Sequence, residues 1–189
     1  FRFTPLQTSF GCNMLALNGG RPEQLTLRTF LTNFIAFREE VVARRTAFEL
    51  RKARERSHIL CGLAVTVSNV DEIVATIRAS SDASEAREKL MQRSWPANEI
   101  REYIALIDDP THKINDDGTY NLSEAQVRAI LELRLQRLTQ IGVKEVTDEL
   151  EALSSKIKEY LEILASRSKI MAIISVSYTH LTLPTKEEV

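Results

Sequence analysis

Tyrosine side chains are the residues of this sequence that could attack a phosphodiester. Such a nucleophile needs a basic neighbour, usually arginine, and an acidic metal-binding partner site. None of the four tyrosines has an arginine next to it in the chain: Tyr103, Tyr120, Tyr160 and Tyr178. We therefore expect no tyrosine nucleophile, and we interpret Tyr103 and Tyr160 as packing residues.

Histidines, cysteines and paired aspartates form no metal or catalytic pattern either. Neither His58 nor His112 has a second histidine together with a cysteine or carboxylate at the spacing of ligands on a helix. Asp108–Asp109 and Asp116–Asp117 lie in a turn-rich stretch, where aspartate caps and bends the backbone. Cys12 and Cys61 belong to no CxxC motif, and the sequence has no glycine-rich phosphate loop or nucleophile elbow. We expect no catalytic residue, metal or cofactor in this chain.

The strongest local charge pattern is a basic segment at residues 38–56, with seven basic and four acidic residues. It could be a strip that faces DNA phosphates, with Arg44, Arg45, Arg51 and Lys52 as candidate contacts. The alternative is a solvated helix face on which opposite charges lie three or four residues apart. The formal net charge is -1, so any contact with nucleic acid must come from such a local patch.

The elements that would position these residues are mostly helical. The 189 residues include only 6 Gly and 5 Pro. Between Leu27 and Ala79 there is no proline and Gly62 is the only glycine, so about 50 residues can form one helix. Its apolar residues follow the heptad spacing of a coiled-coil seam: Leu27, Phe30, Phe34, Phe37, Val41 and Phe48.

A short β-hairpin is predicted before this helix, at residues 12–27. Asn18-Gly19-Gly20 follows an apolar run, and both residues of an Asn-Gly pair accept the positive φ of a type I′ turn. Thr26 is placed to cap the helix that follows.

Short helices are predicted in the middle of the chain. The first helix breaks near Ser80, and Asp82 with Glu85 can cap a new one. Pro96 suits the first turn of another helix that runs to about Ile107, and a polar loop follows up to Gly118.

A second long helix is predicted from the capping box Ser123/Gln126 to about Ile174, with a weak point at Gly142. Its heptad seam is clear: Val146, Leu150, Leu153, Ile157, Tyr160 and Leu164. The economical arrangement is an antiparallel pair of long helices with the short helices at its tip. We therefore expect a mainly α fold, with a long two-helix coiled coil, a small helical domain and a short N-terminal hairpin.

The last residues do not look native. Residues 176–185 (VSYTHLTLPT) resemble a translated sequencing adapter, so we leave 176–189 out of the functional reasoning. No stretch has the roughly 18 uninterrupted apolar residues that a membrane span needs, and the start resembles no signal peptide. We expect a cytoplasmic fragment of a longer protein.

Three blocks of this sequence resemble the A subunit of bacterial DNA gyrase, a type IIA DNA topoisomerase. They are TSFGCNMLAL (8–17), EVVARRTAFELRKA (40–53) and SEAQ followed by AILELRLQRLT (123–139). They occur in the family's order and spacing, and the similarity extends over about residues 4–174.

The resemblance implies a domain plan. Residues 1–27 would end the tower domain, 28–79 would be the first arm helix, 80–122 the gate domain and 123–175 the returning arm helix. In this family the catalytic tyrosine, the ATP site and the Mg²⁺ site lie elsewhere, on other domains or on the B subunit. The fragment should therefore be inactive alone, and its partners would be a second copy, the gyrase B subunit and double-stranded DNA, with no membrane.

The gate implied by the resemblance needs an apolar, self-complementary patch around a two-fold axis. The candidates lie where the short helices meet the second long helix: Tyr120, Leu122, Ala125, Gln126, Ala129 and Ile130. Each could instead pack inside the protomer. The A subunit of topoisomerase IV, or a coiled-coil scaffold unrelated to topoisomerases, are the alternative identities.

Overall fold

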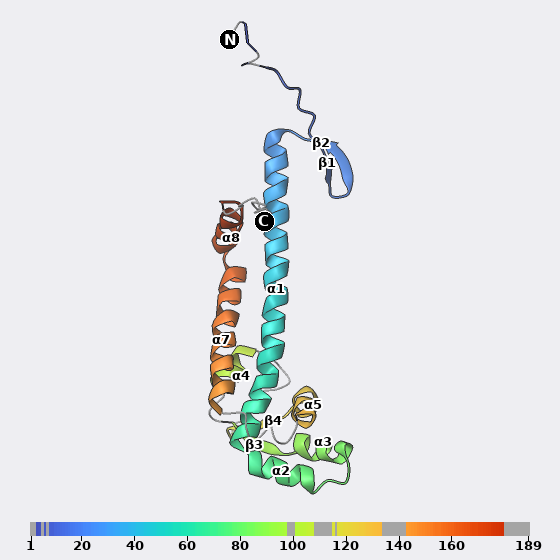
Figure 1. Cartoon of the computed structure of the whole chain (residues 1–189), viewed down its shortest axis with the longest axis vertical. Coiled ribbons are helices and arrows are strands. Elements are labelled where there is room, and N and C mark those ends of the chain that lie inside the picture. Colours follow the sequence, from blue (N-terminus) through green and yellow to red (C-terminus); the bar gives the residue numbers. More distant parts are fainter. Residues whose placement is uncertain are drawn as a thin grey trace, which may run out of the picture. The chain divides into compact units, whose positions relative to one another are not determined.

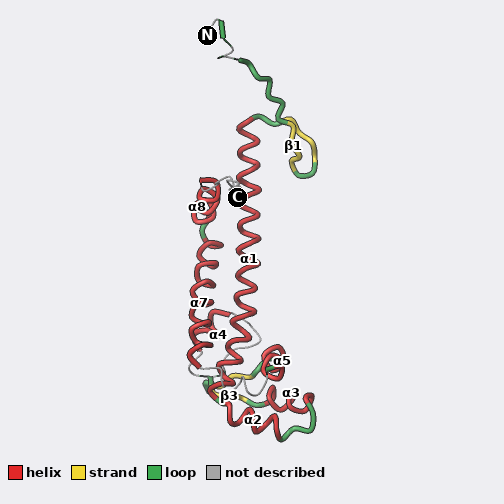
Figure 2. The backbone as a smooth tube through the Cα atoms, in the orientation of Figure 1, coloured by secondary structure: helices red, strands yellow, loops and turns green. Residues whose placement is uncertain are grey.

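The computed structural model describes residues 3–4, 6, 8–97, 101–107, 115, 117–133 and 143–179. The chain divides into two units, residues 1–45 with 167–189 and residues 46–166. Helices dominate both, and the strands form only two small antiparallel pairs in the described residues (Figures 1 and 2). The mainly α fold, with a long helix and an N-terminal hairpin, is confirmed, while the domain boundaries given above stay predictions.

The hairpin in the first unit pairs β1 (Leu15–Asn18) with β2 (Arg21–Gln24). Its turn consists of Gly19 and Gly20, with φ of 58° and 82°, because Asn18 remains in the strand opposite Arg21. The hairpin is thus confirmed, but the turn lies one residue later than expected. Glycine takes positive φ without steric penalty, so Gly-Gly displaces Asn-Gly from the turn.

Helix α1 (Leu27–Ser68) begins at Thr26, whose hydroxyl accepts a hydrogen bond from the Thr29 N–H at 3.3 Å. It ends at Ser68 and not at Ala79, and α2 (Val70–Arg78) leaves at 91°. Asn69 favours this end, because its amide donates to the Val65 carbonyl oxygen at 2.8 Å and satisfies a terminal acceptor. Within the described residues, no single helix is long and apolar enough to cross a membrane; only the bent pair of α1 and α2 meets that test together.

The helix expected from Ser123 to Ile174 is interrupted. α5 (Glu124–Glu132) ends at Glu132, because the backbone of the next residue, Leu133, is extended. α7 (Val143–Ala165) and α8 (Arg167–Thr179) are separated at Ser166. The weak point proposed at Gly142 lies outside the described residues. α8 continues past Ile174 to Thr179, and its Arg167 binds Glu39 of α1 at 2.9 Å within the first unit.

Helices α1 and α7 pack antiparallel in the second unit. Arg56 binds the Glu149 carboxylate with two nitrogens, at 2.9 and 3.1 Å, and Leu50 and Ala53 pack with Ile157. The seam predicted on α7 is confirmed, because Val146, Leu150 and Ile157 are buried and its other members are half-buried.

The seam predicted on α1 is wrong. Leu27 and the phenylalanines of that stripe are 39 to 59% exposed. The buried stripe of α1 in the second unit is another one: Leu50, Ala53, Ser57, Leu60 and Ala64. Its small residues let α7 come close, whereas heptad spacing alone identifies an apolar stripe without saying what covers it.

The short helices share one core with α1 and α7. α2, α3 (Ala83–Gln92), α4 (Arg101–Ile107) and α5 surround a strand pair, β3 (Ser94–Pro96) with β4 (Thr119–Asn121). Trp95 is fully buried and its indole N–H donates to the Leu90 carbonyl oxygen at 3.1 Å. Pro96 lies in β3 opposite Thr119, so the helix start that we expected there is wrong. An edge strand tolerates proline where the ladder of hydrogen bonds does not need that residue's backbone N–H.

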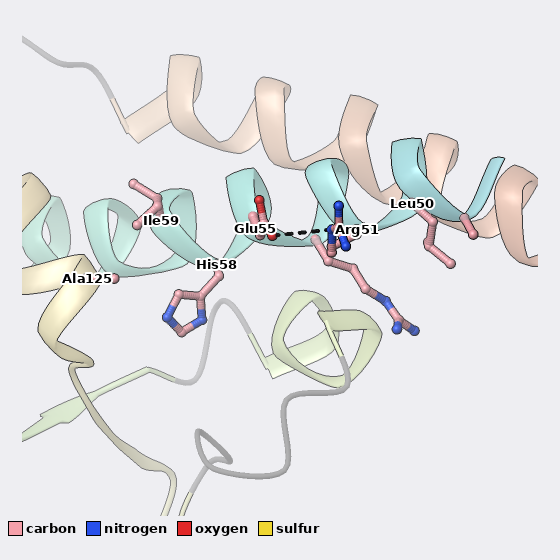
Figure 3. Close-up of a pocket in the computed structure, with 8 residues that line it drawn as sticks. Leu50, Arg51, Glu55, His58, Ile59 and Ala125 are labelled. Atoms are coloured by element: carbon pink, nitrogen blue, oxygen red, sulfur yellow. Dashed lines mark ion pairs between the residues drawn. The ribbon is translucent and has the colours of Figure 1, made fainter. Parts of the chain in front are cut away.

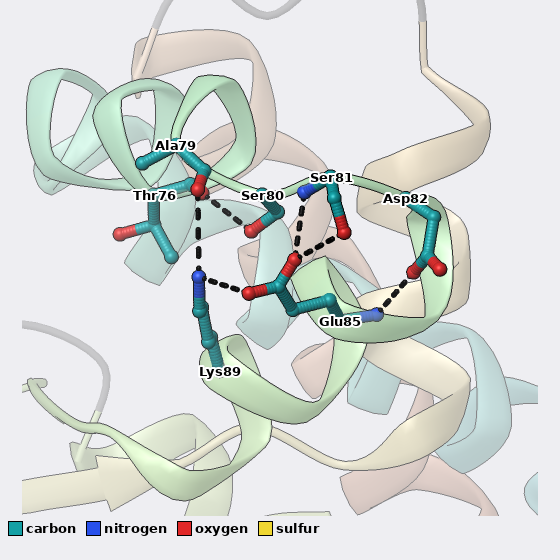
Figure 4. A network of polar contacts seen from close by, with 7 residues as sticks. All are labelled: Thr76, Ala79, Ser80, Ser81, Asp82, Glu85 and Lys89. Atoms are coloured by element: carbon teal, nitrogen blue, oxygen red, sulfur yellow. Dashed lines mark hydrogen bonds and ion pairs between the residues drawn. The ribbon is translucent and has the colours of Figure 1, made fainter.

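A corner of hydrogen bonds joins α2 to α3 (Figure 4). Asp82 caps α3 as predicted, accepting from the Glu85 N–H at 2.7 Å. The Glu85 carboxylate binds Lys89 Nζ, the Ser81 N–H and the Ser81 hydroxyl, each at 2.7 Å. The Lys89 hydrogen bond, followed by those from Ser81, lowers the pKa of Glu85 to about 2.

Helix α5 lies against α1 so closely that position 62 has no room for a side chain. A Cβ on Gly62 would lie 2.7 Å from Cγ and 2.8 Å from Cβ of Gln126. Gln126 is fully buried and held by the capping box with Ser123 that the sequence predicted. The glycine at this position therefore sets the distance between the two helices.

We expect Gly62→Ala to destabilise the chain. Alanine gains about 1 kcal/mol of helix propensity, but overpacking against a fixed Gln126 costs about 1–3 kcal/mol. Urea unfolding followed by circular dichroism should show a lower midpoint. Gln126→Gly in the same chain removes both the Cβ and the Cγ that would clash, so the double variant should be more stable than the sum of the two single changes predicts. Additive effects would contradict the contact.

We also expect the stability contributed by Glu85 to depend on pH. Its pKa is depressed in the folded state, so the contribution is complete above its unfolded pKa and disappears as pH falls towards about 2. Wild type should therefore exceed Glu85→Gln in thermal midpoint at pH 7, and the difference should shrink between about pH 4.5 and 2. Glu88→Gln, on an exposed position of the same helix, is the control. A difference that is constant with pH would refute this role.

Candidate functional site

The six gate candidates lie in β4, in α5 and in the link between them, all in the second unit. Four of them are buried within the chain: Tyr120, Leu122, Gln126 and Ile130. They belong to the protomer's own core, the alternative that sequence analysis left open, and they offer no surface to a second copy. Ala125 is exposed and Ala129 is half-buried, so these two keep surface outside the core.

Buried Gln126 explains why these residues are core. Its Nε2 donates to the His58 carbonyl oxygen at 2.7 Å and to the Tyr120 hydroxyl at 3.0 Å. Its Oε1 accepts from the Ser123 N–H at 2.9 Å. Ser123 also contacts α1, since its hydroxyl lies 2.7 Å from Nε2 of His58. A buried polar side chain must find such partners, and these partners fix α5 on α1.

A groove of about 460 Å³ opens beside this network (Figure 3). It follows one face of α1 and ends at the exposed Ala125 of α5. Its lining combines apolar side chains with two arginines, one histidine and one glutamate: Ala47, Leu50, Arg51, Arg54, Glu55, His58, Ile59 and Ala125. Sequence analysis missed this groove, because Ala125 and the α1 residues are far apart in the chain and carry no common motif.

The candidate DNA contacts all lie on α1. Arg44 pairs with Glu40 at 3.2 Å in the first unit, and Arg51 pairs with Glu55 at 3.8 Å in the second. These ion pairs are exposed, so each contributes little to the free energy of folding. The guanidinium groups can therefore exchange partners at a small cost in free energy. Arg44 and Arg45 are neighbours in the first unit, and Arg51 and Lys52 are neighbours in the second.

Phe48 lies between these basic residues and is 47% exposed. Arg51 and Lys52 both cover its ring, at 5.4 and 4.8 Å from the centroid. The cations are therefore held at the helix surface by an aromatic ring rather than extended freely.

Burial disfavours the ionised form of two groups that could carry covalent chemistry, Cys61 and Tyr103. Burial raises the pKa of the Cys61 thiol to about 12, so it stays protonated and unreactive. Burial also raises the pKa of Tyr103, with a smaller effect from Glu151. In the part of the chain that the structure describes, no three histidine, cysteine or carboxylate side chains gather as a metal site would require.

Comparison with known proteins agrees with these features. Residues 1–178 match the family of the DNA gyrase/topoisomerase IV A subunit. The DNA gyrase A subunit of Granulibacter bethesdensis is 45% identical over 193 residues, which cover 100% of this chain and 20% of that protein. The corresponding proteins of Rickettsia bellii and Haemophilus influenzae are also 45% identical, over 90% and 92% of this chain and 19% and 20% of their own lengths.

The chain spans about a fifth of the length of these relatives. Its similarity to them nevertheless covers both units, the antiparallel helices and the core of short helices. The chain belongs to the family of the DNA gyrase/topoisomerase IV A subunit.

Proposed function

We propose that this chain supplies the arm and the dimer exit gate of the A subunit of an ATP-dependent type II DNA topoisomerase that introduces negative supercoils. The single observation that carries the proposal is the family match over residues 1–178. The antiparallel packing of α1 and α7, next to a compact core of short helices, supports it, since a lever with a folded end suits a gate that opens and closes.

The proposal assigns chemistry to other parts of the enzyme. DNA cleavage, ATP hydrolysis and Mg²⁺ binding would belong to other domains or to the gyrase B subunit, so this chain alone should be inactive. Its partners would be a second copy, the B subunit and double-stranded DNA, in the cytoplasm. Between the two enzymes of the family, the relatives named above favour gyrase, and topoisomerase IV is the alternative. Family membership excludes an unrelated coiled-coil scaffold.

The gate would use the exposed side of α5. Ala125 and Ala129 are four residues apart and so lie on one face of the helix, while Gln126 and Ile130 face the core. Small side chains on an outer face let a second helix approach closely. This arrangement supports a homodimer related by a two-fold axis.

The basic face of α1 would contact the DNA that passes the gate. Arg44, Arg45, Arg51 and Lys52 are not buried, and the ion pairs of Arg44 and Arg51 are with exposed glutamates. Contacts of this kind neutralise phosphates without reading sequence, which suits an enzyme that passes any duplex.

We expect Ala129→Arg to weaken the dimer by about tenfold or more while the protomer keeps its helices, because it places a charge on the two-fold patch. Sedimentation equilibrium and circular dichroism on one sample measure both effects. Ala152→Arg, at an exposed position of α7, is the matched control. Loss of helix would put Ala129 in the core, and an unchanged dimer would remove this face of α5 from the gate.

Replacing Arg44, Arg45, Arg51 and Lys52 together with glutamine should weaken duplex binding and lower its salt dependence. Each lost phosphate contact should reduce the slope of log K against log salt by about 0.9. Fluorescence anisotropy with a labelled duplex at several salt concentrations measures the slope, and gel analysis of the same samples should show no cleaved DNA. Glutamine at Lys156 and Lys158 of α7 is the control. An unchanged slope would reject the strip, and cleaved DNA would reject the expected inactivity.

A further inference from the structure

We propose that the groove on α1 binds a small amphiphilic anion, a molecule with an apolar ring or chain and one anionic group such as a carboxylate. The groove lies wholly within the second unit, along one face of α1 and up to Ala125 of α5 (Figure 3). This binding site goes beyond the proposed arm and gate, and it does not depend on a second copy of the chain.

The size of the groove suits a small molecule. Its volume of about 460 Å³ lies within the range of about 300–1,000 Å³ that is usual for small-molecule sites. The α1 residues that line it run from Ala47 to Ile59, which corresponds to about 18 Å at 1.5 Å per residue. A molecule that fills this groove is therefore elongated.

Apolar side chains form one part of the lining. Leu50 is buried and Ile59 is half-buried, while Ala47 and Ala125 are exposed. The small side chains leave space for a ligand, and the larger ones offer it an apolar surface. A ring or hydrocarbon chain that lies against them is removed from water, which favours binding.

The charged part of the lining selects an anion. Arg51 and Arg54 contribute two guanidinium groups, whereas Glu55 contributes the single carboxylate among the described residues that line the groove. Arg51 and Glu55 lie 3.8 Å apart and their side chains are 68% and 69% exposed, so Arg51 can exchange this partner for a ligand at little cost. A guanidinium group can donate two parallel hydrogen bonds to one carboxylate, and such charge-assisted bonds are stronger than bonds to a neutral group.

The walls of the groove are held in place by the buried network of α5. Nε2 of Gln126 donates to the His58 carbonyl oxygen at 2.7 Å, and the Ser123 hydroxyl lies 2.7 Å from Nε2 of His58. These contacts fix the start of α5, and with it Ala125, beside α1. A site that is formed in advance binds its ligand without the free-energy cost of ordering its walls.

Anilinonaphthalene sulfonate is a suitable probe, because it combines apolar rings with one anionic group and fluoresces in apolar surroundings. We expect the 189-residue chain to bind it saturably at one site. Phenylnaphthylamine has the same rings without the sulfonate, and we expect it to bind about tenfold more weakly, because it gains no charge-assisted hydrogen bond.

Two substitutions test whether the probe lies in the groove. Ala47→Phe fills the groove and should weaken the binding of both probes by about tenfold or more, whereas Ala152→Phe, at an exposed position of α7, should not. Arg51→Gln should weaken the sulfonate by about fivefold and leave phenylnaphthylamine unchanged, with Lys156→Gln as the matched control. Circular dichroism checks that each variant keeps its helices.

The proposal is overturned if the two probes bind equally well, or if Arg51→Gln leaves the affinity for the sulfonate unchanged. An Ala47→Phe variant that keeps its helices and its affinity for both probes would place the probes outside the groove and overturn it as well. Should Ala47→Phe lose helix, Arg51→Gln alone decides. The readout is the fluorescence of a bound probe, so a failure here leaves the proposed gate, which sedimentation tests, unaffected.

Discussion

The packing of buried Gln126 against Gly62 is the contact on which the second unit depends. Gln126 brings an amide into the core, and its desolvation is compensated only if each polar atom finds a partner. His58, Tyr120 and Ser123 supply those partners, and Gly62 supplies the space. Apolar side chains could pack at several angles, whereas this set of hydrogen bonds is satisfied in one relative position of α1 and α5.

Once α5 is held on α1, the remaining short elements have defined places. β4 leads into α5, and Tyr120 brings β4 and its partner β3 into the same core, where Trp95 is buried. On another side of α1, the small residues of its buried stripe accept α7. In the second unit α1 is therefore the common support, and the other elements pack on different faces of it.

The same packing decides which residues are free to form the gate that we propose. By drawing Gln126 and Ile130 inward, it leaves Ala125 and Ala129 outward and forms a groove where α5 begins beside α1. A gate must hold two copies together and still release them, so it requires a surface of moderate area with small side chains and exchangeable ion pairs rather than a second hydrophobic core. The exposed Arg51–Glu55 pair has this character.

Local rules in the sequence determined much of this protein. The caps at Thr26, Asp82 and Ser123, the hairpin, and the seam of α7 all follow from interactions within a few residues, and the structure contains each of them. Three blocks of sequence were also enough to identify the family.

The tertiary structure alone decided the rest. Within the second unit, α7 packs on the stripe of α1 that has small residues, while Phe48 of the predicted seam stays exposed. Ala125 joins a groove with residues more than sixty positions away, and a sequence records no such neighbour. Periodicity predicts which residues share a face of a helix, but only the packing of elements distant in the chain determines what that face contacts.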